Sequence, residues 1–180
     1  IWAKDAGCQA RMKKFNMTRP EELQAYVMKR VEVILKAKGK KLIGWDEILE
    51  GGIGPEATVM SWRGIKGGIE AAKMGHYVVM TPTTFAYLDY QQGESTIEPP
   101  IYAGLRLQKC YSFEPVPEGV EAKYILGGQG NLWTEQVATL RHAEYMIWPR
   151  AWALAEDIWS PKEAKNWSGC AQRGKRKFDR

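Results

Sequence analysis

Short apolar runs alternate with helix-like segments along this 180-residue chain, and that alternation restricts its fold more than any other feature. The runs lie at residues 42–45, 57–62, 76–80 and from 124 onward. Each run is free of charged residues, which is typical of strands in a parallel sheet buried on both faces. The sequence therefore predicts an α/β fold in which parallel strands alternate with helices.

The clearest helical segment begins near Thr18. Thr18 and Glu21 have the spacing of a capping box, and Pro20 suits a first turn, where a missing amide costs little. Gly39 is suited to end the helix. Between these signals runs an apolar stripe at three- and four-residue spacing, formed by Leu23, Tyr26, Val27, Val31, Ile34 and Leu35.

Two further helices are predicted, one of them weak. Residues 64–75 are interrupted by glycine, and residues 138–159 are broken or kinked at Pro149. The segment 83–123 is rich in proline and is expected to hold little regular structure. We find no repeat or linker and predict that residues 1–180 form a single unit.

Composition and charge exclude several classes of protein. A hydrophobic share of 44% with 26% charged residues excludes a disordered chain. The net charge of +5 comes from residues 161–180, which we interpret as a basic helix or tail and not as a surface for nucleic acid. No apolar stretch is long enough to span a bilayer, and no leader-like segment opens the sequence. We expect neither nucleic acid nor membrane as a partner.

Aromatic and acidic side chains recur where the predicted strands end. Carboxyl ends of parallel strands converge on one rim, which is where α/β proteins bind ligands. Aromatic rings cover the apolar face of a sugar, and carboxylates accept bonds from its hydroxyls. The sequence therefore predicts a pocket for one sugar ring. The residues at these ends are Trp45, Trp62, Tyr87, Asp89, Trp133 and Glu135.

Other chemistries fit the sequence poorly. Asp46 and Glu47 resemble an acid–base pair, but we interpret them as supporting or salt-bridging groups just past a strand end. His76 and His142 lack the neighbours of a metal site, and the glycine runs lack the pattern of a phosphate loop. No metal or cofactor is expected.

Several segments, taken in order, resemble the catalytic domain of glycoside hydrolase family 20, the β-N-acetylhexosaminidases. They are KLIGWDEILEGG at 41–52, ATVMSWRG at 57–64, HYVVMTP at 76–82, YLDY at 87–90, YSFEPVP at 111–117, NLWTE at 131–135 and EYMIWPRAWALAEDIWS at 144–160. The family fold is a (β/α)₈ barrel. Because four strands are too few to close one, the resemblance implies its second half, strands five to eight; from pattern alone, a small open sheet is the other possibility.

The resemblance also implies residue roles. Trp45, Trp62 and Trp133 match the walls of the family's sugar pocket. Tyr87 matches the hydroxyl that bonds the substrate's acetamido carbonyl and stabilises the cyclised intermediate of a substrate-assisted, retaining reaction. Asp89 and Glu135 match the carboxylates that hold the outer hydroxyls.

The implied activity is hydrolysis of terminal non-reducing N-acetylhexosamine, with glycans ending in N-acetylglucosamine or N-acetylgalactosamine as partners. The family's acid pair lies in an H-x-G-D-E motif, which this sequence does not contain. We therefore expect this chain alone to be inactive, and to need the first half-barrel or to dimerise through its sheet edges. The alternatives are a non-catalytic carbohydrate-binding protein and a small structural domain with buried tryptophans. Family members are commonly periplasmic, secreted or lysosomal, and the sequence favours none of these compartments.

Overall fold

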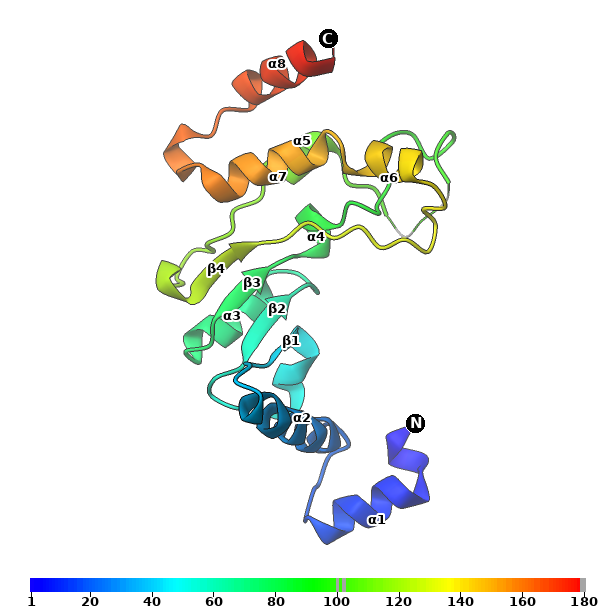
Figure 1. Ribbon diagram of the computed structural model, residues 1–180, viewed down its shortest axis with the longest axis vertical. Helices are drawn as coiled ribbons and strands as arrows, with labels where there is room; N and C mark the ends of the chain where they lie inside the picture. The colour runs from blue at the N-terminus through cyan, green and yellow to red at the C-terminus, as the bar shows by residue number, and fades with distance from the viewer. Residues whose placement is uncertain (100, 102, 179–180) are drawn as a thin grey trace.

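Four parallel strands lie side by side in chain order, as the alternating pattern predicts. In this computed structural model, which describes residues 1–99, 101 and 103–178, the sheet runs β1-β2-β3-β4 (Figure 1). The strands are shorter than the apolar runs that predict them. Their bounds are β1 Ile43–Trp45, β2 Thr58–Ser61, β3 Val78–Met80 and β4 Ile125–Gly128.

The pairing register brings the carboxyl ends of the strands to one rim. Trp45 pairs with Met60 and Ser61 with Met80, and Met80 also pairs with Gly128 on its other side. The residues that follow these positions therefore emerge together at the same edge of the sheet, which is the arrangement that the predicted site requires.

The helices connect and flank these strands. Helices were predicted at 18–39, 64–75 and 138–159, and the structure has α2, α3 and the pair α6–α7 there, with the break at Pro149. Helix α1 was not predicted. The α-helices are α1 Ala6–Lys14, α2 Glu21–Ala37, α3 Lys66–Lys73, α4 Thr83–Ala86, α5 Leu107–Tyr111, α6 Leu140–Ile147, α7 Arg150–Trp159 and α8 Trp167–Phe178. The 3₁₀ turns are η1 Trp2–Lys4, η2 Asp46–Gly51, η3 Ala122–Tyr124 and η4 Lys162–Ala164.

Among its described residues, the segment 83–123 holds only α4, α5 and the start of η3, so its predicted irregularity is confirmed. Helix α8 and η4 occupy most of the segment 161–180, of which residues 179–180 lie outside the described residues. None of the helices in the described part of the chain is both long and apolar enough to cross a membrane.

The capping residue of α2 differs from the prediction. The carboxylate of Glu22, and not that of Glu21, accepts bonds from Thr18 N at 3.1 Å, Thr18 Oγ1 at 3.0 Å and Arg19 N at 2.9 Å. Pro20 directly precedes α2 and already has helical backbone angles. The acid that reaches the free main-chain amides of Thr18 and Arg19 is therefore one residue further along the chain than the Thr18–Glu21 spacing of a capping box assumes. Gly39 ends the segment with φ +66°, as predicted.

Helix α3 lies close against the sheet because it has glycine at the contact. A Cβ at Gly68 would lie 2.5 Å from Met80 Sδ and 3.0 Å from Ser61 Cβ. Gly68 N also donates to Ser61 Oγ at 2.8 Å. The glycines that weaken the helical pattern in the sequence therefore permit the packing that buries Val59 and Val78 in the core.

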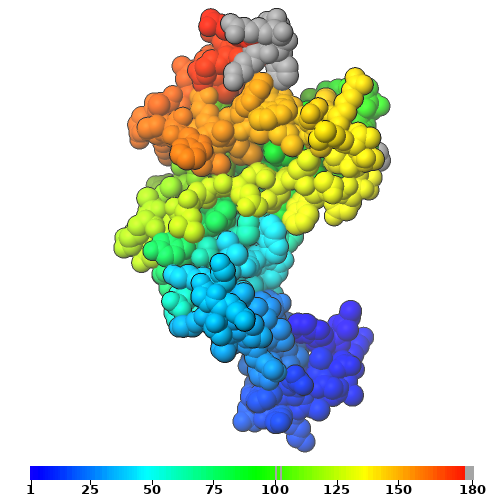
Figure 2. All heavy atoms as spheres, in the orientation of Figure 1, coloured from blue at the N-terminus to red at the C-terminus, as the bar shows by residue number. Residues whose placement is uncertain are grey.

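The predicted apolar stripe of α2 is only partly covered. Leu23 and Ala25 are buried, but Ile34 is 63% exposed and Val27 is also exposed. In Figure 1, α2 lies at one end of the sheet and α5 and α7 lie at the other, beyond β4. Figure 2 shows the N-terminal residues, in dark blue, projecting from the rest of the molecule. The elements therefore form an elongated array and not a closed ring.

Candidate functional site

A pocket of about 550 Å³ lies at the carboxyl rim of the sheet, where the sequence predicts a site. It brings together all six predicted site residues. Glu47 and Tyr90 also line it. The pocket is lined by Trp45, Glu47, Trp62, Tyr87, Asp89, Tyr90, Trp133 and Glu135.

Two tryptophans from opposite edges of the sheet meet in this pocket. Trp45 ends β1, and Trp133 follows β4 by five residues. Their ring centroids lie 5.9 Å apart at an interplanar angle of 46°. Because Trp45 lies on β1 and Trp133 lies in the segment that follows β4, this contact shows that the segment after β4 turns back toward the end of β1 at the rim.

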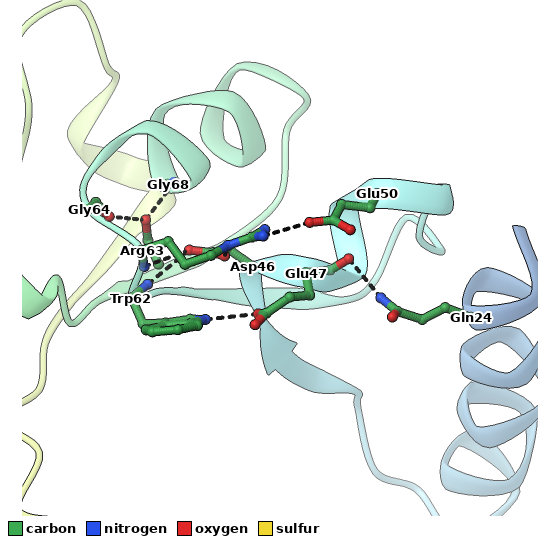
Figure 3. Close-up of polar contacts among 9 residues, drawn as sticks. Gln24, Asp46, Glu47, Glu50, Trp62, Arg63, Gly64 and Gly68 are labelled. Atoms are coloured by element: carbon green, nitrogen blue, oxygen red, sulfur yellow. Dashed lines mark hydrogen bonds and ion pairs between the residues drawn. The ribbon is translucent and has the colours of Figure 1, made fainter. Parts of the chain in front are cut away.

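The side chain of Trp62 is fixed by the two adjacent acids that follow β1. Trp62 N donates to Asp46 Oδ2 at 2.9 Å, and Trp62 Nε1 donates to Glu47 Oε2 at 2.8 Å (Figure 3). On its other side the indole stacks on Tyr87, with centroids 6.3 Å apart at 24°. The main chain and the indole ring of Trp62 are thus both held by the two acids that follow β1, so Trp62 forms a rigid wall of the pocket.

Asp46 and Glu47 have different surroundings although they are adjacent. Asp46 is buried and forms an ion pair with Arg63 Nε at 2.5 Å, as the sequence interpretation expected. Arg63 also pairs with Glu50 at 2.6 Å, and these two acids raise the pKa of Arg63. Glu47 instead lines the pocket, and its carbonyl accepts from Gln24 Nε2 at 2.7 Å (Figure 3). Asp46 is therefore a supporting group, whereas Glu47 supports Trp62 from within the pocket.

Tyr87 and Asp89 reach the pocket because main-chain pairing continues beyond β3 and β4. Asn131 N donates to Ala86 O at 2.8 Å, and Leu88 N donates to Asn131 O at 2.6 Å. This pairing aligns Tyr87 with Asn131 and leaves Tyr87 only 6% exposed. Burial raises the pKa of Tyr87, so the phenol stays protonated and can donate a hydrogen bond at neutral pH.

The carboxylate of Asp89 has an oxygen without a partner. Asp89 is 1% exposed, and its Oδ1 has no hydrogen-bond partner among the described residues. Burial raises the pKa of Asp89, and the nearby charge of Glu135 adds to that effect, whereas main-chain hydrogen bonds and Arg150 oppose it. A buried acceptor that is left open in a pocket is suited to a ligand hydroxyl.

Another hollow, between α5, α7 and α8, shows why the rim pocket is the better candidate. It has a volume of about 490 Å³ and also contains tryptophans, Trp152 and Trp167. The acid that lines it is already paired, since Glu156 accepts from Arg173 Nη2 at 2.5 Å and from Tyr111 Oη at 2.7 Å. No acceptor comparable to Asp89 Oδ1 faces it among the described residues.

Sequence reasoning missed Glu47 and Tyr90 as pocket residues. Tyr90 contacts Tyr87 with centroids 5.6 Å apart at 59° and lies in the same YLDY segment, so its position after a strand end was a usable signal. Glu47 lies two residues after Trp45, within the turn η2, whose direction the sequence does not give. Within the described residues, no three His, Cys, Asp or Glu side chains are grouped as a metal site needs.

Comparisons with known proteins identify relatives of this chain. The family model described as glycosyl hydrolase family 20, catalytic domain, matches residues 1–162. A β-hexosaminidase of Porphyromonas gingivalis is 44% identical over 177 residues, which are 96% of this chain and 23% of that protein. A β-hexosaminidase of Vibrio furnissii is 35% identical and covers 86% of this chain and 26% of that protein. The chain thus spans about a quarter of these relatives.

Solved structures agree with the sequence relatives. A GH20 exo-β-N-acetylglucosaminidase of Vibrio harveyi in complex with N-acetylglucosamine is 32% identical with a TM-score of 0.88, over 97% of this chain and 28% of that one. A Streptomyces plicatus N-acetyl-β-hexosaminidase in complex with Thio-NAglucal is 26% identical with a TM-score of 0.78, over 88% of this chain and 34% of that one. These comparisons confirm the resemblance that the strand-end segments indicated.

Proposed function

Because the chain belongs to glycoside hydrolase family 20, we propose that it supplies the sugar-holding part of an enzyme that hydrolyses terminal N-acetylhexosamine from β-N-acetylhexosaminides. The supporting observation is the rim pocket, which aromatic rings line together with Asp89, whose buried Oδ1 has no hydrogen-bond partner among the described residues. An apolar sugar face packs on such rings while its hydroxyls bond the carboxylate.

Within this proposal each pocket residue has a role. Trp45, Trp62 and Trp133 enclose one sugar ring. Tyr87 donates to the acetamido carbonyl of the substrate, whose oxygen is the nucleophile in the family's substrate-assisted reaction. Asp89 and Glu135 accept bonds from the outer hydroxyls. The protonated state of the phenol, which its raised pKa favours, suits that donation.

We further propose that residues 1–180 correspond to strands five to eight of the family barrel and form one unit. The parallel order of the strands and the exposed apolar residues at both ends of the sheet support this proposal. The acid that protonates the leaving group would then come from another part of the enzyme, since the sequence has no H-x-G-D-E motif.

Ligand titration tests the sugar site directly. N-acetylglucosamine is expected to change the tryptophan fluorescence of the chain, and glucose, which lacks the acetamido group, is expected to bind more weakly. Tyr87→Phe should reduce this preference by about fivefold, since a hydrogen bond contributes about 1 kcal/mol. Tyr77→Phe, at the opposite end of β3, is the matched control and should leave it unchanged. A fluorescence signal that N-acetylglucosamine does not change would contradict the proposal.

A carbohydrate-binding protein without activity is the second candidate, and the absent acid motif favours it for this chain taken alone. Turnover of nitrophenyl N-acetylglucosaminide separates the two. We expect the 180-residue chain to bind the sugar but not to hydrolyse this substrate. Turnover that Glu47→Gln abolishes would show that the acid had been assigned to the wrong part of the enzyme.

A further inference from the structure

Arg150 is a fully buried cation directly behind the rim pocket. It is the first residue of α7 and has 0% exposure. Among the residues that the structure describes, its guanidinium donates only to main-chain carbonyls. Nη1 bonds Tyr90 O at 2.7 Å and Leu105 O at 3.1 Å, and Nη2 bonds Leu88 O at 2.5 Å and Met146 O at 2.6 Å.

This placement of Arg150 is unfavourable for stability. Burial of a cation is costly, and it lowers the pKa of Arg150. A positive charge at the start of a helix also opposes the helix dipole. In the described part of the chain no carboxylate lies within ion-pair distance of Arg150, and its Nε has no hydrogen-bond partner. Apolar side chains commonly replace buried charges without loss of stability, so packing alone does not explain an arginine here.

The carbonyls that Arg150 holds explain its position. Leu88 and Tyr90 are the residues on either side of Asp89, so the guanidinium donates hydrogen bonds to the main-chain carbonyls of the two residues that flank this acid. Met146 and Leu105 anchor the same guanidinium to α6 and to the segment before α5. A planar group with five donors can span these carbonyls, which a lysine ammonium cannot do with the same geometry.

We propose that Arg150 is a positioning residue for the sugar site, which orients Asp89 through the Leu88 and Tyr90 carbonyls and supplies the positive charge that keeps Asp89 an acceptor. The sugar-binding part of this inference rests on the proposed function. The geometric and electrostatic part concerns Asp89 itself and can be measured without a ligand.

Several charged or titratable groups act on Asp89. Burial and Glu135 raise the pKa of Asp89, whereas main-chain hydrogen bonds from Asp89 and Trp133 and, to a smaller extent, the charge of Arg150 lower it. Tyr87 and Tyr90 line the same pocket, while Glu98 and His142 line a small cavity on the other side of Asp89. Of these neighbours, Arg150 is the cation that opposes burial. Removal of its charge should therefore raise the pKa of Asp89 further, so that the acid becomes ionised only at higher pH.

The test compares Arg150→Lys with Arg150→Gln in the full chain, followed by ¹³C NMR of the Asp89 carboxyl across pH. Both variants lose the guanidinium fork, but only Arg150→Lys keeps the charge. We expect Arg150→Gln to raise the Asp89 midpoint and Arg150→Lys to leave it near that of the wild type. Arg141→Met, an exposed arginine on α6, is the control and should change nothing. Far-UV circular dichroism verifies the fold of each variant.

Affinity for N-acetylglucosamine provides the second readout. Both Arg150 variants should bind the sugar at least fivefold more weakly at neutral pH, and Arg150→Gln should recover part of the loss at higher pH. Equal Asp89 midpoints in Arg150→Lys and Arg150→Gln would refute the electrostatic role, and wild-type affinity in both would refute the positioning role. A wild-type chain that binds no sugar would refute the proposed function instead, while the NMR comparison would still decide the role of Arg150.

Discussion

Trp62 is the pocket wall whose support is most complete at the level of single residues. Asp46 binds its main chain, Glu47 binds its indole nitrogen, and Tyr87 stacks on its ring. An aromatic ring that contacts a sugar contributes most to binding affinity when its orientation is already fixed in the free protein, because the side chain then loses little rotamer freedom on binding. Glu47 is therefore expected to affect affinity through Trp62.

We predict that Glu47→Leu weakens N-acetylglucosamine binding by about fivefold, which corresponds to one lost hydrogen bond of about 1 kcal/mol. Glu47→Gln keeps an oxygen acceptor for Trp62 Nε1 and should retain most of the affinity. Isothermal titration calorimetry measures both. Equal affinity in Glu47→Leu and the wild type would mean that the 2.8 Å bond does not hold the indole in its binding orientation.

Asp157 predicts how the stability of the fold depends on pH. It is buried in α7, with Oδ1 2.6 Å from Lys165 Nζ. Burial raises the pKa of Asp157 to about 7, although Lys165 lowers it. Because this is above the ordinary value for an aspartate, the folded state binds the proton more tightly between about pH 4 and 7. The contribution of Asp157 to stability is therefore complete below about pH 4 and is lost as pH rises toward 7.

Urea unfolding across that pH range measures this effect. The free energy of unfolding of Asp157→Asn, which cannot titrate, should fall less steeply with rising pH than that of the wild type. Glu163→Gln, an exposed neighbour in η4, is the control and should keep the wild-type slope. A slope in Asp157→Asn equal to that of the wild type would show that this acid is already ionised throughout the range.

Much of the site was predictable because its aromatic and acidic residues follow apolar strands. Trp45 ends β1 and Trp62 directly follows β2, whereas Tyr87 and Trp133 lie seven and five residues beyond β3 and β4, and the pocket contains each of them. Arg150 follows no such rule. In the sequence it is a charged residue at the start of a helix, where a solvent-exposed position is the ordinary expectation. Its burial depends on contacts with carbonyls that lie 45 to 62 residues away in the chain.

At the level of elements, α3 and β3 show what the sequence pattern misses. The apolar runs identified every strand, and the helical stripes identified α2, α3, α6 and α7. Because glycine lowers helix propensity, the sequence indicates α3 only as a weak helix. The sequence also gives no sign that Gly68 of this helix lies close against Ser61 and Met80. The Thr18 cap was wrong by one residue for a similar reason, since the backbone at Pro20 decides which acid reaches the free amides.

We predict that Gly68→Ala destabilises the fold by about 1–3 kcal/mol, because the added methyl group would overlap Met80 Sδ. The gain in helix propensity of about 1 kcal/mol offsets part of this loss. Gly174→Ala in α8 is the matched control. Its added Cβ would meet no atom within 4 Å, so this variant should gain helix propensity without a steric cost and should be slightly more stable than the wild type. Thermal unfolding distinguishes them. A Gly68→Ala variant as stable as Gly174→Ala would mean that α3 can move away from the sheet at little cost.

For the whole molecule, the open ends of the sheet are the dominant feature. Within the described residues, β1 and β4 each have one strand neighbour, and Ile43 on β1 and Leu126 on β4 are 51% and 60% exposed. Such edges expose unpaired main-chain groups beside apolar side chains, which promotes association between chains. The exposed residues of α2 extend this surface at one end of the sheet.

We therefore predict that the 180-residue chain in isolation self-associates, with an average mass that rises with concentration in analytical ultracentrifugation. Leu126→Lys places a charge on the β4 edge and should shift the distribution toward the monomer. Leu140→Lys, at a still more exposed leucine on α6, should not do so. A monodisperse monomer that melts cooperatively at every concentration would contradict this prediction.

The contact between Trp45 and Trp133 has a consequence for how the molecule responds to occupancy. Trp45 ends β1 and Trp133 lies in the segment beyond β4, so the hollow between them depends on the bend of the sheet and on the path of that segment. A molecule lodged there would stabilise the bent form over flatter ones by its own binding free energy. By the same linkage, a structural element that packs beside β1 or β4 and changes the bend of the sheet would change the affinity for the bound molecule without contacting it.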